Sequence, residues 1–463
     1  MNLFKKKVLV VGLGITGVAT ARFLNKMGAV VTVTDMAEED ELGQHVATIR
    51  ELGINMKLGS HENRTFENVD MIVLSPGVPH DIPQIQQAKN KGVNVLGEIE
   101  LASKFIDQPV IAITGTNGKT TTTTLLGEML KSSGFNVFVG GNIGSPLIGY
   151  VDSEKKAEII VLEVSSFQLD TIESFRPKLS VLLNITEDHL DRYPDFTAYV
   201  KSKCRIFENQ KAGDTAVLNG GDPLIRKYTK NINSRKLFFT ARKNSEAGAT
   251  INGQNINIYF DGSCTSPIPL SIDLSRTRIR GKHNIENVSA ACLAALSEGG
   301  TIEGIQTALN RFKGLPHRLE YVATVNGVKY FNDSKATNVD AVTRALECFN
   351  DRVILIMGGR NKGADFDLFR DTIRRMTKKI IAIGEAKENI ISSFNKVVPV
   401  NTALTMEDAV LKARDTAQPG DVVLLSPACS SFDMYHDYGH RGKVFCQAVE
   451  RLEKGGGKTG DQP

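Results

Sequence analysis

The feature that most constrains this chain is an apolar run that ends in a glycine-bearing loop and leads into a helical pattern. It spans residues 110–121, Val-Ile-Ala-Ile-Thr-Gly-Thr-Asn-Gly-Lys-Thr-Thr. Glycines allow successive backbone N–H groups to face one anion, Lys119 adds a positive charge, and the Thr120 hydroxyl suits a magnesium ion. The usual motif spaces its glycines five positions apart, whereas Gly115 and Gly118 are three apart. We therefore predict a shortened phosphate loop, rather than an ordinary turn, between a strand and a helix.

Length and composition indicate several folded domains. At 463 residues the chain is too long for one hydrophobic core, so about three domains are expected. Its 41% hydrophobic and 23% charged residues are ordinary for a globular protein, and a net charge of +4 gives no case for nucleic acid. No apolar run is long enough to span a bilayer, and the six cysteines are scattered. We expect a cytoplasmic protein with reduced thiols, no membrane segment and no nucleic-acid partner.

The N-terminal segment has the pattern of a dinucleotide-binding unit. A short strand, Lys7–Val11, precedes a Gly-x-Gly-x-x-Gly motif at 12–17 and a helical pattern, and a second strand ends at Asp35. This order predicts NAD binding, with Asp35 on a ribose. Two alternatives stay open: the glycines only allow close packing of a helix on the strand, or the crevice holds another nucleotide such as a UDP-sugar. Ser75 follows a third strand at the same sheet edge, and the first domain is expected to end near residue 97.

Polar residues follow the apolar strands of the central region. The strand Ile159–Leu162 ends in Glu163, and a carboxylate at the mouth of a buried strand is costly unless it is paired or binds a metal. Beside a phosphate loop, Glu163 is the first candidate for a metal ligand, with a structural salt bridge as the alternative. Asn142 lies in the glycine cluster 140–144, which predicts a loop at a strand end; it either reaches a ligand or belongs to a plain turn.

Further ionisable residues are crowded between positions 187 and 192, at the exit of another strand. His189 among them is a candidate metal ligand or acid–base group, although the neighbouring aspartates could simply cap the next helix. That helix carries Lys203, which the pattern alone would place in solvent. Asn287 shares a face of a later alanine-rich helix with Asn284, and polar residues at a helix start are most often caps.

A third region begins near residue 315. Three of its strands lead into polar loops, at 333–338, 358–363 and 426–433. Strands that end together in polar loops are typical of the ligand-binding edge of a doubly wound sheet. The last residues, 454–463, are rich in Gly, Lys and Asp and are predicted to be disordered.

The order of these motifs, rather than any one of them, resembles the Mur ligase family across essentially the whole chain. The shared stretches are 114–120, the Asn-Ile-Gly turn at Asn142, 163–168, 187–191, His283-Asn284 with Asn287, and Pro316-His317-Arg318. Within the family, Asn-Asp-Ser-Lys-Ala-Thr-Asn at 332–338 resembles the branch that adds D-glutamate to UDP-N-acetylmuramoyl-L-alanine. Siblings that add other amino acids typically carry Asp-x-Ala-His there.

The resemblance implies an α/β fold of three domains. These are a Rossmann-like UDP-binding domain at 1–97, a central ATPase domain with a mostly parallel sheet at 98–314, and a mobile Rossmann-like domain for the amino acid at 315–463. It also implies ATP, two magnesium ions, an acyl phosphate intermediate and a place in cytoplasmic peptidoglycan precursor synthesis. We expect the protein to act as a monomer.

The family roles carry over residue by residue. Those expected to meet the UDP-sugar are Ile15, Thr16, Asp35, Ser75 and Asn142. Those expected on ATP are Gly115, Thr116, Asn117, Gly118, Lys119, Thr120, Thr121, Asn287, Arg318 and Asp333. Those expected to receive the D-glutamate carboxylates are Lys335, Thr337, Lys362, Ser431, Phe432 and Tyr438. Magnesium would be held by Thr120, Glu163, His189 and Lys203, and the catalytic set is Lys119, Glu163, His189 and Lys203.

Lys203 matches the position at which relatives carry a carbamylated lysine. A free ammonium would repel Mg²⁺, whereas a carbamate is an anionic oxygen ligand. One departure from the family pattern concerns the nucleotide base: Met36 and Ala37 follow Asp35, where some relatives have a basic residue that helps to hold uracil.

Other functions explain parts of the sequence. A nicotinamide-dependent dehydrogenase would account for the N-terminal glycines and Asp35, but it would leave Lys119, Glu163 and the third region without a role. A non-catalytic nucleotide-binding regulator would use the phosphate loop but would not need Lys335 or Lys362. Among enzymes, the alternative is a sibling ligase of the same family that adds another amino acid.

Overall fold

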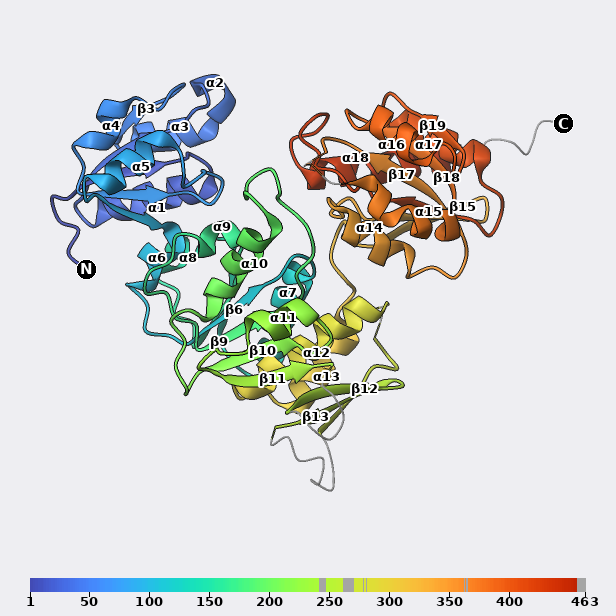
Figure 1. Cartoon of the computed structure of the whole chain (residues 1–463), viewed down its shortest axis with the longest axis horizontal. Coiled ribbons are helices and arrows are strands. Elements are labelled where there is room, and N and C mark those ends of the chain that lie inside the picture. The colour runs from blue at the N-terminus through green and yellow to red at the C-terminus, as the bar shows by residue number, and fades with distance from the viewer. Residues whose placement is uncertain are drawn as a thin grey trace. The chain divides into compact units, whose positions relative to one another are not determined.

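The structure, a computed structural model, describes residues 1–240, 247–260, 270–277, 279, 281–361, 363 and 365–455. Within these ranges the strands form three sheets. The chain divides into two compact units, of which the first comprises 1–185, 197–277 and 286–311 and the second comprises 186–196, 278–285 and 312–463. The first unit contains two of the sheets and the second unit contains the third (Figure 1).

The N-terminal sheet has five parallel strands in the order β3-β2-β1-β4-β5. Their bounds are β1 (Lys7–Val11), β2 (Val30–Thr34), β3 (Asn55–Lys57), β4 (Met71–Leu74) and β5 (Asn94–Gly97). The helices among them are α1 (Ile15–Lys26), α2 (Glu39–Leu42), α3 (Gln44–Glu51), α4 (Asn63–Glu67) and α5 (Pro83–Asn90). The strand order reverses between β1 and β4, so the carboxyl ends of these two strands form the crevice where ligands of such sheets bind.

The central sheet has the order β14-β13-β12-β11-β10-β9-β6-β8-β7, and it is parallel from β7 to β12. Its parallel strands are β6 (Val110–Thr114), β7 (Val137–Gly141), β8 (Ile159–Glu163), β9 (Leu179–Leu182), β10 (Thr215–Asn219), β11 (Arg235–Phe239) and β12 (Gly248–Asn252). Two antiparallel strands, β13 (Asn255–Tyr259) and β14 (Leu270–Asp273), complete the edge. The strands around β6 are fully buried apolar runs, as expected for parallel strands covered on both faces.

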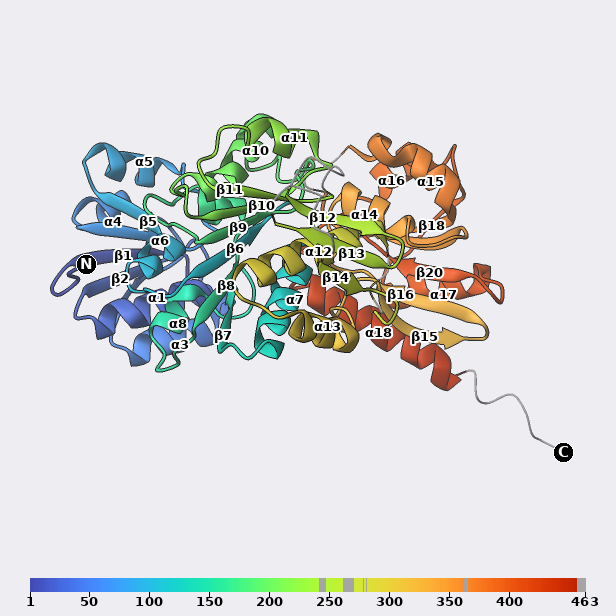
Figure 2. The same cartoon turned by 90° about the horizontal axis from the view of Figure 1, so that it is seen from below.

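Helices cover this sheet and link it to the N-terminal one. They are α6 (Glu98–Ser103), α7 (Lys119–Ser132), α8 (Leu147–Val151), α9 (Ser166–Leu169), α10 (Phe196–Cys204) with a 3₁₀ turn (Arg205–Phe207), α11 (Pro223–Tyr228), α12 (Lys282–Ser297) and α13 (Ile302–Arg311). Helix α7 packs on β7 and β8 and against α13 (Figure 2). Gly127 of α7 allows this approach, because a side chain there would collide with Val139 of β7.

The third sheet has the order β15-β16-β20-β17-β18-β19, with only the β15–β16 pair antiparallel among the described strands. The strands are β15 (Glu320–Val325), β16 (Val328–Asn332), β17 (Val353–Gly358), β18 (Thr377–Ile383), β19 (Val400–Thr402) and β20 (Val422–Leu425). The helices are α14 (Val339–Leu346), a 3₁₀ turn (Phe366–Phe369), α15 (Arg370–Met376), α16 (Lys387–Phe394), α17 (Met406–Thr416) and α18 (Tyr438–Gly455).

The period of two in β17 explains why this third sheet is covered on both faces. Val353, Leu355 and Met357 belong to one apolar cluster, whereas Ile354 and Ile356 belong to another. Successive side chains of a strand point to opposite faces, so each face needs its own layer of helices. The predicted α/β class with mostly parallel sheets is confirmed.

The end of β7 and the C-terminal tail differ from the sequence predictions. Gly140 and Gly141 extend β7 by pairing with Leu162 and Glu163, so the loop that was expected to begin at residue 140 begins at Asn142. Helix α18 extends to Gly455, so the predicted disorder at 454 and 455 is wrong, and the rest of that tail, 456–463, lies outside the described residues. Among the helices that the structure does describe, none combines the length and the apolar character needed to cross a bilayer.

Candidate active site

The phosphate loop lies at the carboxyl end of β6, between β8 and β9. Gly118, with φ of +87°, ends the loop and starts α7. Glycine is required there, because a side chain would enter the space filled by the amide of Asn287. Thr120 and Thr121 lie in the first turn of α7, where the backbone N–H groups and the helix dipole favour an anion. The predicted loop is therefore present, with Asn287 beside it.

Two lysines reach one carbonyl of this loop. Lys119 Nζ donates to the carbonyl oxygens of Gly115 and Thr116 at 2.9 Å each, and Lys203 Nζ donates to Gly115 O at 2.8 Å. Lys203 is 1% exposed, and its nitrogen lies 4.5 Å from the centre of the Tyr199 ring. Tyr199 and Lys203 are four residues apart on α10 and so share a face. The placement of Lys203 in solvent, which the pattern alone suggested, is wrong because this face of α10 packs on the loop.

Asn184 holds the phosphate loop and was not among the predicted site residues. Its side chain accepts a hydrogen bond from the Asn117 amide at 2.8 Å and donates to Asn117 O at 2.9 Å, while its own carbonyl accepts from Thr116 N. One asparagine therefore fixes the turn between the two loop glycines. The only signal in the sequence was its position directly after an apolar strand.

Glu163 ends β8 beside the loop and is 2% exposed. Its Oε1 accepts a hydrogen bond from Asn142 Nδ2 at 2.9 Å, whereas its Oε2 has no hydrogen-bond partner among the described residues. The Asn142 amide also donates to Glu163 O, and a side chain at Gly141 would collide with that same backbone. A buried carboxylate oxygen without a donor suits a hard cation, so the residues present fit a magnesium ion.

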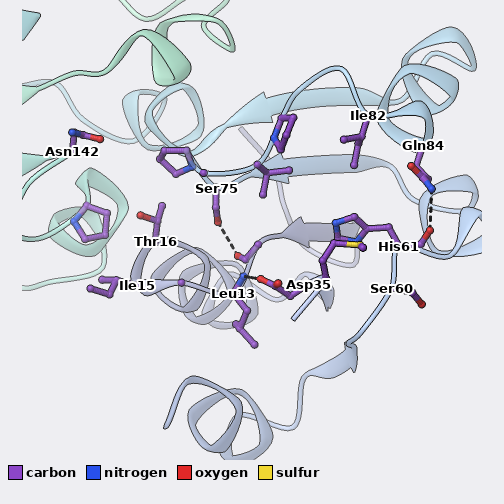
Figure 3. Close-up of a pocket in the computed structure, with 18 of the residues that line it drawn as sticks. Leu13, Ile15, Thr16, Asp35, Ser60, His61, Ser75, Ile82, Gln84 and Asn142 are labelled. Carbon is purple, nitrogen blue, oxygen red and sulfur yellow. Dashed lines mark hydrogen bonds between the residues drawn. The ribbon is translucent and has the colours of Figure 1, made fainter. Parts of the chain in front are cut away.

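A cavity of about 990 Å³ lies at the carboxyl ends of β1 and β4 and extends to the loop after β7. All five residues predicted to face a UDP-sugar line it, namely Ile15, Thr16, Asp35, Ser75 and Asn142. Figure 3 shows Asn142 and Ile15 at one end of this cavity and His61 and Gln84 at the other. The cavity thus runs from the end of β2 to the residue that contacts Glu163.

Hydrogen bonds shape the glycine loop at the floor of this cavity. Asp35 accepts from the amides of Leu13 at 2.6 Å and Ala37 at 2.9 Å. Ser75 Oγ donates to Gly12 O at 2.8 Å, which joins the ends of β1 and β4 (Figure 3). Both predicted residues therefore fix the loop in addition to facing the cavity.

His61 and Gln84 also line the cavity and were missed by the sequence analysis. His61 Nδ1 lies 3.1 Å from Thr34 Oγ1, and Gln84 Nε2 donates to His61 O at 3.1 Å. Burial lowers the pKa of His61 and so favours the neutral imidazole. The nearby Asp35 carboxylate acts in the opposite direction but is the smaller effect. These residues follow β3 and begin α5, and nothing in the local pattern distinguishes them from ordinary loop residues.

The second unit contains the remaining predicted ATP contacts. Asp333 follows β16 and is buried, accepting from Leu319 N at 3.1 Å and Ser426 Oγ at 3.0 Å. Burial raises the pKa of Asp333 to about 7, although the Arg318 charge and these hydrogen bonds act in the opposite direction. The charge of Arg318 thus acts on the Asp333 carboxylate.

The loops predicted to bind D-glutamate also meet in the second unit. Lys335 Nζ lies 5.1 Å from the centre of the Tyr438 ring. Ser431 is buried, whereas Phe432 next to it is 64% exposed. Thr337 is half-buried in the same loop as Lys335, and Lys362 lies outside the described residues.

His189, a predicted metal ligand, also belongs to the second unit. The neighbouring Asp188 accepts a hydrogen bond at its Oδ2 from Asn338 Nδ2 at 3.0 Å.

Arg441 on α18 fixes two of these loops and was missed by the sequence analysis. It is 1% exposed, and its guanidinium donates to Ser334 O at 2.8 Å and Ser334 Oγ at 3.0 Å. It also donates to Cys429 O at 3.1 Å and Ser430 O at 3.2 Å. Burial lowers the pKa of Arg441 to about 10. An arginine in an amphipathic helix is normally solvated, so no local pattern singled out Arg441.

Comparison with known proteins identifies the family. Three sequence models match successive parts of the chain: the Mur ligase MurD-like N-terminal domain at 6–97, the Mur ligase middle domain at 113–295, and the Mur ligase glutamate ligase domain at 317–429. The chain belongs to the Mur ligase family. This confirms the resemblance that the order of motifs indicated.

Relatives in the Mur ligase family match over nearly the full length. A UDP-N-acetylmuramoylalanine--D-glutamate ligase of Desulfosudis oleivorans is 54% identical, with 97% of each chain covered. A protein of the same name from Desulfatibacillum aliphaticivorans is 50% identical over 98% of this chain and 100% of its own. A MurF ligase from Thermotoga maritima, solved in complex with ADP, shares the fold with a TM-score of 0.60 at 16% identity, covering 98% of this chain and 99% of that one.

Proposed function

We propose that this Mur ligase joins D-glutamate to the alanyl carboxylate of UDP-N-acetylmuramoyl-L-alanine at the expense of ATP, in peptidoglycan precursor synthesis. The observation that supports this most directly is the double role of Asn142, which lines the cavity and donates to Glu163. A sugar nucleotide in the cavity would therefore extend toward the phosphate loop. Relatives at 44–54% identity that share the name UDP-N-acetylmuramoylalanine--D-glutamate ligase support the same activity.

The chain's own residues suit phosphoryl transfer to a carboxylate. Gly115 to Thr121 would bind the ATP phosphates through backbone amides, and Lys119 would offset the charge that develops on the transferred group. Asn184 would keep the loop in this shape through its hydrogen bonds to Asn117. The alanyl carboxylate would attack the γ-phosphorus to give an acyl phosphate and ADP. The amine of D-glutamate would then attack the carbonyl and displace phosphate, which leaves the amide.

Two magnesium ions would be held, one by Thr120 and Glu163 and a second by His189, with a carbamylated Lys203 as a further ligand. When bound they would neutralise charge on the phosphates. The Glu163 Oε2 atom, buried without a hydrogen-bond donor, supports this assignment. Asn287, Arg318 and Asp333 would position the nucleotide. The D-glutamate carboxylates would meet Lys335, Thr337, Lys362, Ser431, Phe432 and Tyr438, where the two lysines supply the positive charge.

We also propose domain boundaries near residues 97 and 314.

Phosphate release from ATP tests the proposal. Purified protein is incubated with UDP-N-acetylmuramoyl-L-alanine, with D-glutamate, with both or with L-glutamate in place of the D isomer. We expect release only when the UDP substrate and D-glutamate are both present. Release that needs L-lysine, diaminopimelate or L-glutamate instead would assign the chain to a sibling activity. A change of NAD(P)H absorbance with substrate would favour the dehydrogenase alternative.

The carbamate on Lys203 has its own test. The Lys203 nitrogen would keep one N–H after modification, so the hydrogen bond to Gly115 O could persist. Activity should fall in buffers stripped of CO₂ and return with bicarbonate. Lys203→Ala should be inactive in chloride and recover with small carboxylates. Full activity of Lys203→Ala in chloride would remove Lys203 from the metal site.

A further inference from the structure

Glu98 is a buried carboxylate outside the set of residues assigned to the reaction. It is the first residue of α6, directly after β5, and is 2% exposed. The backbone that carries it is fixed, because a side chain at Gly97 would collide with Thr171. Its Oε1 accepts a hydrogen bond from Ile148 N at 2.6 Å, whereas no residue within the described ranges donates to its Oε2. No cation in the described part of the chain forms an ion pair with it.

The partner of Glu98 is the start of α8, a helix that cannot cap itself. The residue at its N-cap is Pro146, which has no side-chain acceptor for the first amides of the helix. Glu98 supplies that acceptor from a segment 50 residues earlier in the chain. Helix α6 and helix α8 pack together (Figure 1). The position of the N-terminus of α8 is thus set by α6.

The loop before α8, residues 142–146, is the one that joins the cavity to Glu163. Asn142 and Pro146 line the cavity, and Asn142 donates to Glu163 from both its backbone and its side chain. The loop is closed by a hydrogen bond from Gly141 N to Ser145 O at 2.9 Å. Loop 142–146 therefore has one anchor at Glu163 and the other at Glu98.

Packing alone does not explain a carboxylate at position 98. Its second oxygen lacks a donor, and burial raises its pKa to about 7, against the lowering effect of the Leu147 and Ile148 amides. An apolar side chain of similar size would avoid this desolvation cost. The hydrogen bond to α8, in contrast, requires a side chain of this length that ends in an acceptor.

We propose that Glu98 is a positioning residue that sets loop 142–146 so that Asn142 meets both Glu163 and the sugar nucleotide. This inference rests on the proposed function for its kinetic consequence. The hydrogen bond to Ile148 N needs an acceptor oxygen at the right distance rather than a negative charge. The length of the side chain at position 98 should therefore determine whether the bond forms. Glu98→Asp keeps the charge but is too short for Ile148 N, whereas Glu98→Gln keeps the length and one acceptor oxygen.

Glu100 provides a matched control on the same helix. It is fully buried and accepts from the amides of Glu173, Ser174 and Phe175. These amides belong to a segment with no residue in the cavity. Glu100→Asp should therefore lower the Tm without changing the KM of any substrate.

The experiment compares steady-state kinetics and hydrogen–deuterium exchange in the full-length chain. In Glu98→Asp we expect the KM for UDP-N-acetylmuramoyl-L-alanine to rise about tenfold, the scale of a lost helix cap. The KM values for ATP and D-glutamate should stay unchanged, and Glu98→Gln should restore most of the affinity. The Ile148 amide should exchange faster in Glu98→Asp than in the wild type.

Unchanged exchange at Ile148 in Glu98→Asp, or an equal rise of all three KM values, would overturn the inference. A lower Tm with unchanged KM values would reduce Glu98 to a structural role and likewise contradict it. If the wild type does not turn over this UDP substrate, the proposed function fails. The exchange comparison would still decide whether Glu98 positions the loop.

Discussion

The phosphate loop of the first unit and the loops at 333–338 and 426–433 of the second unit both follow parallel strands, but they are held in different ways. In the phosphate loop, Asn184 makes two hydrogen bonds to Asn117, and Lys119 folds over its own loop. In the second unit, Arg441 of a distant helix bonds the backbone of both loops. The phosphate loop is therefore held by its own lysine together with an asparagine 67 residues from Asn117 in the sequence, whereas the loops of the second unit share one buried guanidinium 107 residues from Ser334.

This difference predicts how substitutions in each site affect activity and stability. A change at Lys119 should remove chemistry and leave the fold intact, since the hydrogen bonds of Lys119 are to carbonyls of its own loop. A change at the buried guanidinium should disturb stability and substrate binding together, because it leaves several carbonyl oxygens without a donor. Four substitutions test this, beginning with the largest expected effect.

Lys119→Ala should lower phosphate release by about 10³-fold, because it removes the charge that faces the transferred group. The Tm should change little, since Gly115 O keeps Lys203 as a hydrogen-bond donor. Lys131→Ala is the control: Lys131 lies on the same helix in an exposed ion pair with Glu128. Substantial residual release in Lys119→Ala would mean that the loop does not carry the reaction.

Arg441→Met should destabilise the protein by about 3 kcal/mol, since a buried network loses its donor. The KM for D-glutamate should rise more than the KM for ATP, because Ser334 and Ser430 flank the residues proposed to bind the amino acid. The control is Arg451→Met on the same helix, where the arginine forms an exposed, 3.6 Å ion pair with Glu407. Equal Tm losses in the two variants, measured calorimetrically, would contradict the anchoring role.

These two sites also show how far sequence reasoning extends. The phosphate loop could be predicted because its strand, glycines, lysine and threonine are contiguous, and Glu163 because a charge at the end of a buried strand needs an explanation. The five residues on the UDP-sugar cavity came from the family resemblance, and the cavity contains all of them.

The residues that were missed act through contacts between distant segments. Arg441 has the spacing of a solvated helix residue, and its burial depends on two loops that arrive from other strands. Asn184 and His61 likewise gain their roles from neighbours on other strands. Lys203 was misplaced because the pattern of α10 does not reveal which of its faces packs on the phosphate loop. Local pattern specifies elements, but not which polar side chains become buried between them.

Gly118→Ala should test how tightly the phosphate loop is packed. The positive φ costs about 1–2 kcal/mol for any residue with a Cβ, and the new methyl would also displace the Asn287 amide. Gly134→Ala isolates the first effect, since Gly134 has φ of +99° and open space around it. Both variants should lose Tm, but only Gly118→Ala should lose ATP-dependent phosphate release. Similar activity in both would show that the contact with Asn287 is not needed.

The smallest effect concerns pH in the second unit. Asp333 has its pKa raised to about 7 by burial, so its folded form binds a proton more tightly than its unfolded form does. The stability it contributes is complete below the ordinary aspartate pKa and is lost as the pH rises through 7. Asp333→Asn keeps the shape, accepts from Leu319 N and donates to Ser426 Oγ, but it does not titrate.

The measurement is the difference in Tm between Asp333→Asn and the wild type. We expect this difference to grow by about 2–4 °C in favour of the variant between pH 5 and pH 8. Asp371→Asn on α15, where the carboxylate is 90% exposed, should show no such trend. A flat difference for Asp333→Asn would mean that Arg318 and the two hydrogen bonds compensate burial fully. The second unit would then resemble the phosphate loop, where the side chain of Asn184 pairs with both the amide and the carbonyl of Asn117.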